Sequence, residues 1–212
     1  MARLSLRRRM LEVGAGEGSV AAEMAERTGR RALALDLEAP AVVPAGVHFL
    51  RGDAARLPLA DRCLDAVAFH FALLWMSDPG EVLREARRVL APGGTVLFLS
   101  EPDLAARRDE PDTGLGRLLA EAVSRGGGDP SVTGRLENLC RSAGLRPALR
   151  WTSDEAVAVD DPDETAWEVR FLLSTAMLDE AAAASLTRVE AEAAASGFRR
   201  VRLPILYGTA AR

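Results

Sequence analysis

The residues with the clearest chemical potential are a glycine-rich segment and an acidic residue that follows it. Residues 12–18 are Glu-Val-Gly-Ala-Gly-Glu-Gly and lie between a short apolar run and a helix-like run. Glycines permit a tight turn and let backbone N–H groups approach a ligand at the start of a helix. Asp36 ends the next apolar run about 20 residues after Gly16, where a carboxylate can accept hydrogen bonds from both hydroxyls of a ribose. This combination predicts a nucleoside-binding site.

Two further polar residues lie at the ends of expected strands. Asp53 ends a third apolar run, and His70 comes just after a fourth. Ligands in open parallel sheets bind beyond the carboxyl ends of the strands, so both residues are candidates for the same site. The acidic residues have a structural alternative, which is to cap the helix or turn that follows them. His70 is a candidate base, because imidazole titrates near neutral pH, or else a hydrogen-bonding partner of a cofactor or the backbone.

Alternating strands and helices are needed to bring these residues together. The first hundred residues contain strand patterns at 9–13, 31–36, 47–53, 64–69 and 95–100, and helix patterns at 20–29 and 80–90. Such alternation predicts an α/β fold with a parallel sheet that is covered on both faces. Between the second and third strands, Pro40 and Pro44 leave room for barely one turn of helix.

The pattern loosens after Ser100. Helices are expected over 115–124 and 136–143, and two more within 165–195 that meet at Leu178 and Asp179. A strand is expected over 146–153, and a last strand closes the chain over 197–210. No internal repeat and no long Gly/Ser/Pro linker interrupts the chain, so we expect a single domain over residues 1–212.

Composition excludes several kinds of chemistry. All 27 basic residues are arginine, which removes Schiff-base, pyridoxal phosphate and P-loop lysines. The formal net charge of −4 disfavours a broad nucleic-acid surface. Two cysteines and two histidines, far apart in the chain, predict no metal site. No apolar run reaches the roughly 18 residues that a membrane span needs, and no secretory signal is found, so we expect no membrane partner and a cytoplasmic protein.

The order of the motifs resembles that of the class I S-adenosylmethionine-dependent methyltransferases, and most closely their quinone-biosynthesis (ubiquinone/menaquinone) group. The segments LEVGAGEGS, ALDLE, RGDAARLPLADRCLDAVAF and REARRVLAPGGTVLFL follow the family order across Leu11 to Leu99. The resemblance implies a Rossmann-like, mostly parallel sheet of about seven strands with helices on both faces. The last strand, around Val201 to Tyr207, is expected to insert antiparallel.

The same resemblance implies roles at the methionyl end of S-adenosylmethionine. Glu12 matches the family residue that organises the loop and the methionine amino group. Gly14, Ala15 and Gly16 match the positions that border the methionyl part. The product of methyl transfer is S-adenosyl-L-homocysteine.

Four further matches concern the nucleoside. Asp36 is implied to bind the ribose, and Leu37 to lie beside the adenine. Asp53 is implied to accept a hydrogen bond from the adenine amino group, and Ala54 to offer its backbone amide.

Phe69 and His70 match positions near the sulfonium. The acceptor atom is left open between oxygen, nitrogen and carbon. We assign His70 as the candidate catalytic base for an oxygen or carbon acceptor, which usually needs a base, whereas an amine needs only to lose its proton to water. Glu101 and Asp103 are alternatives at the acceptor site, or loop caps.

The remaining segments are expected to select the acceptor. Residues 9–100 form the cofactor half, and 101–134 and 160–197 are insertions on the side where an acceptor approaches. Trp75 and Met76 are expected to line its pocket. An apolar pocket of modest size predicts a small-molecule acceptor. A homodimer is left open.

Two other functions stay open. One is a protein that binds S-adenosylmethionine without transferring its methyl group, or that catalyses another reaction such as a cyclisation. The other is a nucleotide-dependent oxidoreductase, which the spacing disfavours because the third glycine of a dinucleotide fingerprint comes later. About ten residues precede the first expected strand, so we also expect an exposed cofactor bound with affinity that is micromolar or weaker.

Overall fold

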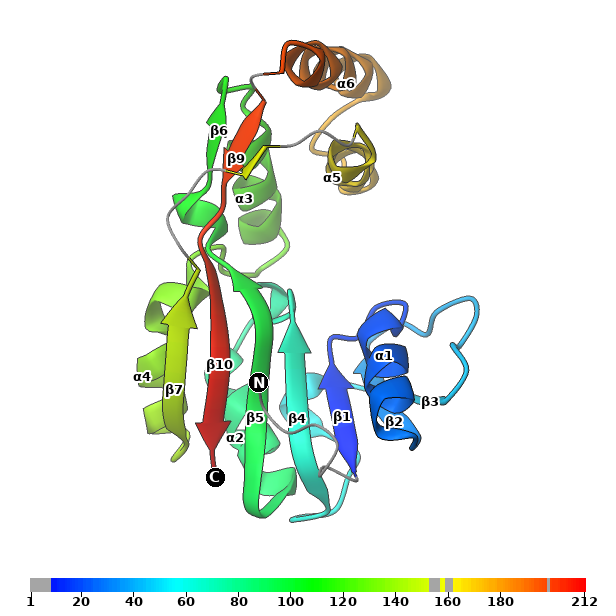
Figure 1. Ribbon diagram of the computed structural model, residues 1–212, viewed down its shortest axis with the longest axis vertical. Helices are drawn as coiled ribbons and strands as arrows, with labels where there is room; N and C mark the ends of the chain where they lie inside the picture. The colour runs from blue at the N-terminus through cyan, green and yellow to red at the C-terminus, as the bar shows by residue number, and fades with distance from the viewer. Residues whose placement is uncertain (1–8, 153–156, 159–161, 198) are drawn as a thin grey trace.

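The computed structural model describes residues 9–152, 157–158, 162–197 and 199–212. Seven strands form one sheet in the order β3-β2-β1-β4-β5-β10-β7 (Figure 1). The strands are β1 (Met10–Val13), β2 (Ala32–Asp36), β3 (Val47–Arg51), β4 (Leu64–His70), β5 (Leu90–Pro102), β7 (Arg146–Trp151) and β10 (Ile205–Ala211). Neighbours pair in parallel except where β10 pairs antiparallel with both β5 and β7. The α/β fold and the antiparallel last strand that the sequence predicts are therefore confirmed.

Three boundaries differ from the sequence prediction. The inserted strand begins at Ile205 and not near Val201, because residues 200–202 pair elsewhere as β9 (Arg200–Arg202). His70 lies within β4 and not just beyond it, since it pairs with Ser100. The strand expected over 95–100 is longer in the structure, where β5 begins at Leu90. The residues just before Thr95 are therefore part of β5, and the pairing of β4 with β5 shifts register there.

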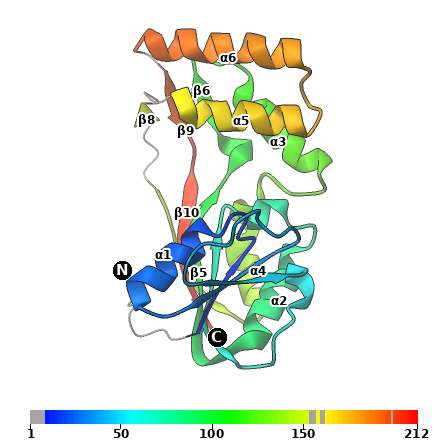
Figure 2. The ribbon, with the colours of Figure 1, turned by 90° about the vertical axis from the view of Figure 1, so that its right-hand side faces the viewer.

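Helices cover both faces of the sheet. Helices α2 (Pro79–Val89) and α4 (Leu136–Ser142) pack on one face, and α1 (Ser19–Thr28) packs on the other (Figures 1 and 2). Asp78 begins α2 as an N-cap whose side chain accepts a hydrogen bond from the backbone N–H of Glu81. As predicted, residues 37–46 contain no helix.

A second body of structure lies beyond the carboxyl edge of the parallel strands, and we call residues 103–134 together with the described part of 157–202 the helical lobe (Figures 1 and 2). Its helices are α3 (Leu115–Arg125), α5 (Pro162–Ser174) and α6 (Glu180–Ala195). A small antiparallel sheet, in the order β6-β9-β8, joins β6 (Arg108–Glu110), β9 and β8 (Val157–Ala158). The three helices share a small apolar core that consists of Leu115, Leu119, Ala122, Val169, Leu172, Ala183 and Leu186.

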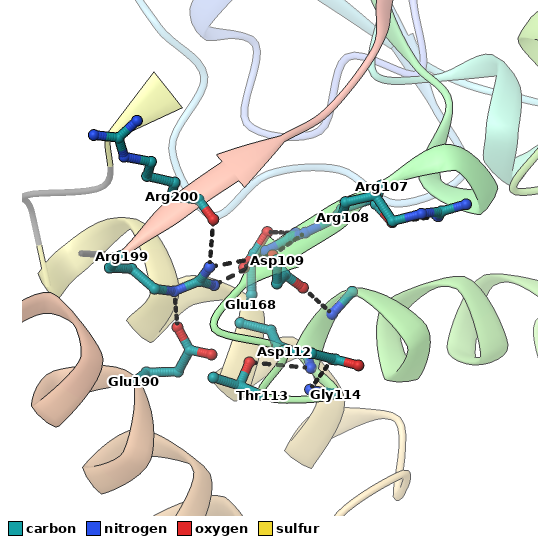
Figure 3. A network of polar contacts seen from close by, with 12 residues as sticks. Arg107, Arg108, Asp109, Asp112, Thr113, Gly114, Glu168, Glu190, Arg199 and Arg200 are labelled. Atoms are coloured by element: carbon teal, nitrogen blue, oxygen red, sulfur yellow. Dashed lines mark hydrogen bonds and ion pairs between the residues drawn. The ribbon is translucent and has the colours of Figure 1, made fainter. Parts of the chain in front are cut away.

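A buried ionic network links the elements of this lobe (Figure 3). Asp109 Oδ1 accepts hydrogen bonds from Arg107 Nε at 3.0 Å and from the Arg199 guanidinium at 3.3 Å. Arg199 Nε donates to Glu190 on α6 at 2.7 Å, and Arg107 pairs with Glu168 on α5. The side chains of Arg107, Asp109, Glu190 and Arg199 are each at most 3% exposed. The network therefore ties β6 and the start of β9 to both outer helices.

Within the described ranges, no helix is long and apolar enough to cross a membrane. No group of three or more metal-binding side chains occurs in the same part of the chain.

Candidate functional site

A cleft of about 300 Å³ opens at the carboxyl ends of the first four strands. Six residues that the sequence assigns to a cofactor line it, namely Gly14, Gly16, Asp36, Leu37, Asp53 and Ala54. The other lining residues are Leu35, Gly52, Phe71, Ala72, Trp75 and Met76. The cleft therefore brings together the glycine loop after β1, the ends of β2 and β3, and the segment after β4.

The glycine loop is shaped by left-handed backbone and by close contacts. Gly14 and Gly16 have φ values of +70° and +51°, which residues with a side chain rarely adopt. A Cβ atom on Gly14 would lie 2.7 Å from the Cβ of Ala72, whereas a Cβ on Gly16 would meet nothing within 4 Å. Gly14 is thus required both for its conformation and for the approach of Ala72.

Asp36 holds this loop in place. Its Oδ2 accepts a hydrogen bond of 2.8 Å from the backbone N–H of Gly16, and its Oδ1 lies 3.4 Å from the backbone nitrogen of Glu38. The side chain therefore lies between the loop and the end of β2, on the wall of the cleft.

Glu12 lies beneath the loop and does not line the cleft. Its residue is 2% exposed, and its Oε2 accepts a hydrogen bond of 2.7 Å from the backbone N–H of Ala21 in α1. Burial raises the pKa of Glu12 to about 7. Ala15 is likewise buried and packs against the core under α1.

The capping alternative is observed at Asp53. Its Oδ1 accepts a hydrogen bond of 2.8 Å from the backbone N–H of Ala55, at the start of the short helix η2 (Ala54–Arg56). Asp53 also lines the cleft with Ala54, so capping and a place in the cleft occur together.

Phe69 and His70, the last two residues of β4, do not line the cleft as the sequence suggests. Phe69 is fully buried and stacks on Phe98 at 6.0 Å between ring centroids. His70 is half-buried, and burial lowers its pKa. Neither residue lines the cleft, which Phe71 lines instead. Phe71 has the left-handed φ value of +52°, for which no signal is visible in the sequence.

Glu101 is fully buried and bonds to backbone. Its carboxylate accepts hydrogen bonds from the N–H groups of Ala72 at 3.3 Å and Leu73 at 2.9 Å, at the start of η3 (Leu73–Trp75). Burial raises the pKa of Glu101 to about 7. Asp103 caps the short helix that follows it by accepting from Ala106. Of the two alternatives for these carboxylates, the structure contains the loop caps.

The helical lobe contacts one wall of the cleft. Trp75 meets Phe171 of α5 edge to face at 5.1 Å between ring centroids, and Phe171 stacks on Trp167 at 5.8 Å. Leu172 lies in the core of the lobe, while Leu173 is 39% exposed. Of the apolar stretch around Phe171, the Phe171 ring contacts the cleft wall, whereas Leu172 packs inside the lobe.

Comparison with known proteins places this geometry among characterised folds. Residues 11–98 match a family model described as a methyltransferase domain. A malonyl-[acyl-carrier protein] O-methyltransferase of Marinomonas sp. is 34% identical over 98 residues, which are 42% of this chain and 36% of that protein. A demethylmenaquinone methyltransferase of Renibacterium salmoninarum is 32% identical over 132 residues, which are 58% of this chain and 55% of that protein.

The fold extends beyond the matched segment. A crystal structure of the [4+2]-cyclase SpnF shares it with a TM-score of 0.61 and 21% identity, over 99% of this chain and 78% of that one. The curated relatives match more narrowly, since this chain spans about a third to a half of their length.

Proposed function

We propose that this chain is a class I S-adenosylmethionine-dependent methyltransferase that methylates a small-molecule acceptor, because residues 11–98 match a methyltransferase-domain model and the relatives of this segment are methyltransferases. The single observation that supports this proposal most is the cleft. Six of the ten residues that the motifs assign to the cofactor converge on it from three different strand ends. Such convergence at the carboxyl edge is where ligands of open α/β sheets bind.

The residues of the cleft suit S-adenosylmethionine, which supplies a methyl group on a positively charged sulfur when it is bound. The left-handed loop of Gly14 and Gly16 brings backbone close to a ligand without Cβ atoms in the way. Asp36 offers carboxylate oxygens at the end of β2 for two ribose hydroxyls. Asp53 and Ala54 offer an acceptor and a backbone amide for the adenine edge.

His70 is proposed as the base for an acceptor that must lose a proton. Its lowered pKa keeps the imidazole neutral at pH 7, so that it can accept one. Its ring lies 5.2 Å from that of Phe71, which lines the cleft. We expect His70→Ala to lower turnover by about 10²–10⁴-fold with little change in cofactor affinity. Equal losses in both quantities would assign His70 to cofactor positioning, and His70→Asn would then keep most of the affinity.

The helical lobe is proposed to cover the acceptor. It lies beyond the carboxyl edge (Figure 2), and Phe171 of α5 contacts Trp75 on the cleft wall. Concave, mostly apolar surroundings favour a small molecule over a polymer. The cytoplasmic location expected from the sequence is part of this proposal.

One alternative has a specific observation in its favour, since a structure with the same fold is described as a cyclase. A protein that binds S-adenosylmethionine and catalyses such a reaction would release no S-adenosylhomocysteine.

Two measurements test the proposal. In calorimetric titrations we expect S-adenosylhomocysteine to bind and NAD not to bind; the reverse would indicate a nucleotide-dependent oxidoreductase. The protein is then incubated with methyl-labelled S-adenosylmethionine and a pool of small metabolites. Mass spectrometry should find both S-adenosylhomocysteine and a labelled product. Binding without either compound would support the non-transferring alternative.

A further inference from the structure

We propose that Glu101 is a positioning residue for the donor site: it touches no ligand itself but fixes the wall of the cleft formed by residues 71–76. This inference rests on the proposed function, because the cleft is taken to hold S-adenosylmethionine. Glu101 is fully buried at the carboxyl end of β5, the strand next to β4. It does not line the cleft.

The first step is the bonding of Glu101 to the segment after β4. Its two carboxylate oxygens accept hydrogen bonds from the adjacent backbone N–H groups of Ala72 and Leu73. Both N–H groups are in buried residues, and buried backbone donors without a partner are rare because desolvation without a bond is costly. Glu101 therefore supplies the hydrogen-bond acceptors that the buried N–H groups of the segment after β4 need.

The second step is the unusual backbone that these bonds hold. Phe71 is in the left-handed region at φ +52°, which is unfavourable for an aromatic residue and persists only when surrounding contacts enforce it. The backbone N–H of Phe71 donates to the carbonyl of Ser100 at 2.8 Å, directly before Glu101. Consecutive residues of β5 thus fix three consecutive backbone donors of the segment.

The third step connects this segment to the donor loop. Ala72 lies so close to Gly14 that a Cβ there would approach the Ala72 Cβ to 2.7 Å and the Met76 Cε to 3.3 Å. Trp75 and Met76 continue the same wall. Any displacement of Ala72 therefore changes the width of the cleft opposite the glycine loop. We infer that Glu101 sets this width through the backbone.

The experiment measures S-adenosylhomocysteine affinity by calorimetry and amide hydrogen exchange of residues 70–77 by mass spectrometry, on the full chain. We expect Glu101→Ala to weaken binding about tenfold or more and to speed exchange in residues 70–77. Glu101→Gln keeps the size and one acceptor oxygen, so it should lose less affinity than Glu101→Ala. Such partial rescue would not follow from a general loss of stability.

Two control variants separate positioning from stability. Asp179→Asn alters another carboxylate that accepts a backbone N–H, at the start of α6 and away from the cleft. Leu145→Ala opens the core at the opposite, amino edge of the sheet, where Leu145 is 2% exposed. Both controls should bind S-adenosylhomocysteine within about twofold of the unaltered protein, although Leu145→Ala lowers its stability.

The outcomes distinguish this inference from the proposed function. If the unaltered protein does not bind S-adenosylhomocysteine, the proposed function fails, and exchange in residues 70–77 still decides whether Glu101 fixes the wall. If it binds, and Glu101→Ala binds equally well with unchanged exchange, Glu101 is not a positioning residue. Loss of affinity in Leu145→Ala equal to that in Glu101→Ala would also overturn the inference.

Discussion

The seven-stranded sheet and the helical lobe both bury carboxylates, but they satisfy them differently. In the sheet, Glu12 on β1 and Glu101 on β5 accept hydrogen bonds from backbone N–H groups of other segments, and among the described residues no arginine pairs with either. In the lobe, Asp109 and Glu190 accept from the side chain of Arg199. A carboxylate bonded to backbone fixes the path of one segment, whereas a carboxylate bonded to arginine fixes how two elements pack together.

This difference matches what each region has to hold. The cleft needs a few backbone segments in defined positions, and Glu12 and Glu101 lie under two of them. The lobe has a small apolar core of its own, which α3, α5 and α6 share. Because a small core stabilises weakly, we expect that breaking the network of Arg107, Asp109 and Arg199 destabilises the lobe.

The largest effect is expected when the lobe network is broken. Arg199→Met removes the cation that faces both Asp109 and Glu190, whose side chains are at most 3% exposed. An uncompensated buried charge typically costs about 3–5 kcal/mol, so we expect a loss of that size in the free energy of unfolding. Urea denaturation measures it.

Arg125→Met is the matched control, because Arg125 pairs with Glu121 while its side chain is 64% exposed. Exposed pairs contribute less than about 1 kcal/mol, so this variant should unfold almost as the unaltered protein does. If both variants lose the same free energy of unfolding, the buried network stabilises the protein no more than an exposed ion pair does, and the comparison of the two regions fails.

The cofactor half could be predicted from the sequence because its signals are local. Apolar runs separated by turn residues define β1 to β5, and Asp78 with Pro79 begins α2. The helical lobe could be predicted only as helices. The strands β6 and β9 are three residues each, rich in arginine and acidic residues, and lie about 90 residues apart. They are strands only because they pair with each other over a long distance in the sequence. Since β9 is used in this pairing, the strand that inserts into the seven-stranded sheet begins later, at Ile205.

The site was predictable to the same extent. Glycines and strand-ending carboxylates mark Gly14, Gly16, Asp36 and Asp53 in the sequence, and all of them line the cleft. Phe71 and Ala72 carry no such signal, because their position depends on a left-handed turn that β5 holds from outside. A sequence pattern indicates which residues end a strand, but it does not indicate the backbone conformation of the segment that follows.

The second prediction concerns donor affinity. Asp36→Ala removes a carboxylate that bonds the Gly16 amide and lines the cleft, so S-adenosylhomocysteine should bind about 1–3 kcal/mol more weakly. Calorimetry measures the change, with Glu38→Ala as the exposed neighbour for comparison. Unchanged affinity in an Asp36→Ala protein of normal thermal stability would show that Asp36 does not contribute to binding in the cleft.

The third prediction uses the raised pKa of Glu101, which is about 7 in the folded protein against an ordinary 4.5. The folded state then keeps a proton that the unfolded state releases, so the free energy of unfolding falls as pH rises from about 4.5 to about 7. Glu12 contributes in the same direction. Glu101→Gln should make this fall shallower, by at most about 1.4 kcal/mol per pH unit. Urea unfolding at pH 5, 6 and 7 checks it, and parallel curves for the two proteins would contradict it.

The smallest effect separates two glycines of one loop. Gly14→Ala and Gly16→Ala both force a side chain into left-handed backbone, which costs about 1–2 kcal/mol in each case. Only the Gly14 variant also drives a Cβ against Ala72, on the wall that Glu101 holds. Because overpacking of this kind adds about 1 kcal/mol or more, Gly14→Ala should bind S-adenosylhomocysteine about fivefold more weakly than Gly16→Ala. In a protein that also carries Glu101→Ala, the wall can retreat, so the gap between the two glycine variants should shrink. If the difference in affinity between the two glycine variants stays the same, Ala72 is fixed by something other than Glu101. Carboxylates bonded to backbone would then not determine the shape of the cleft, which is what the comparison with the lobe requires.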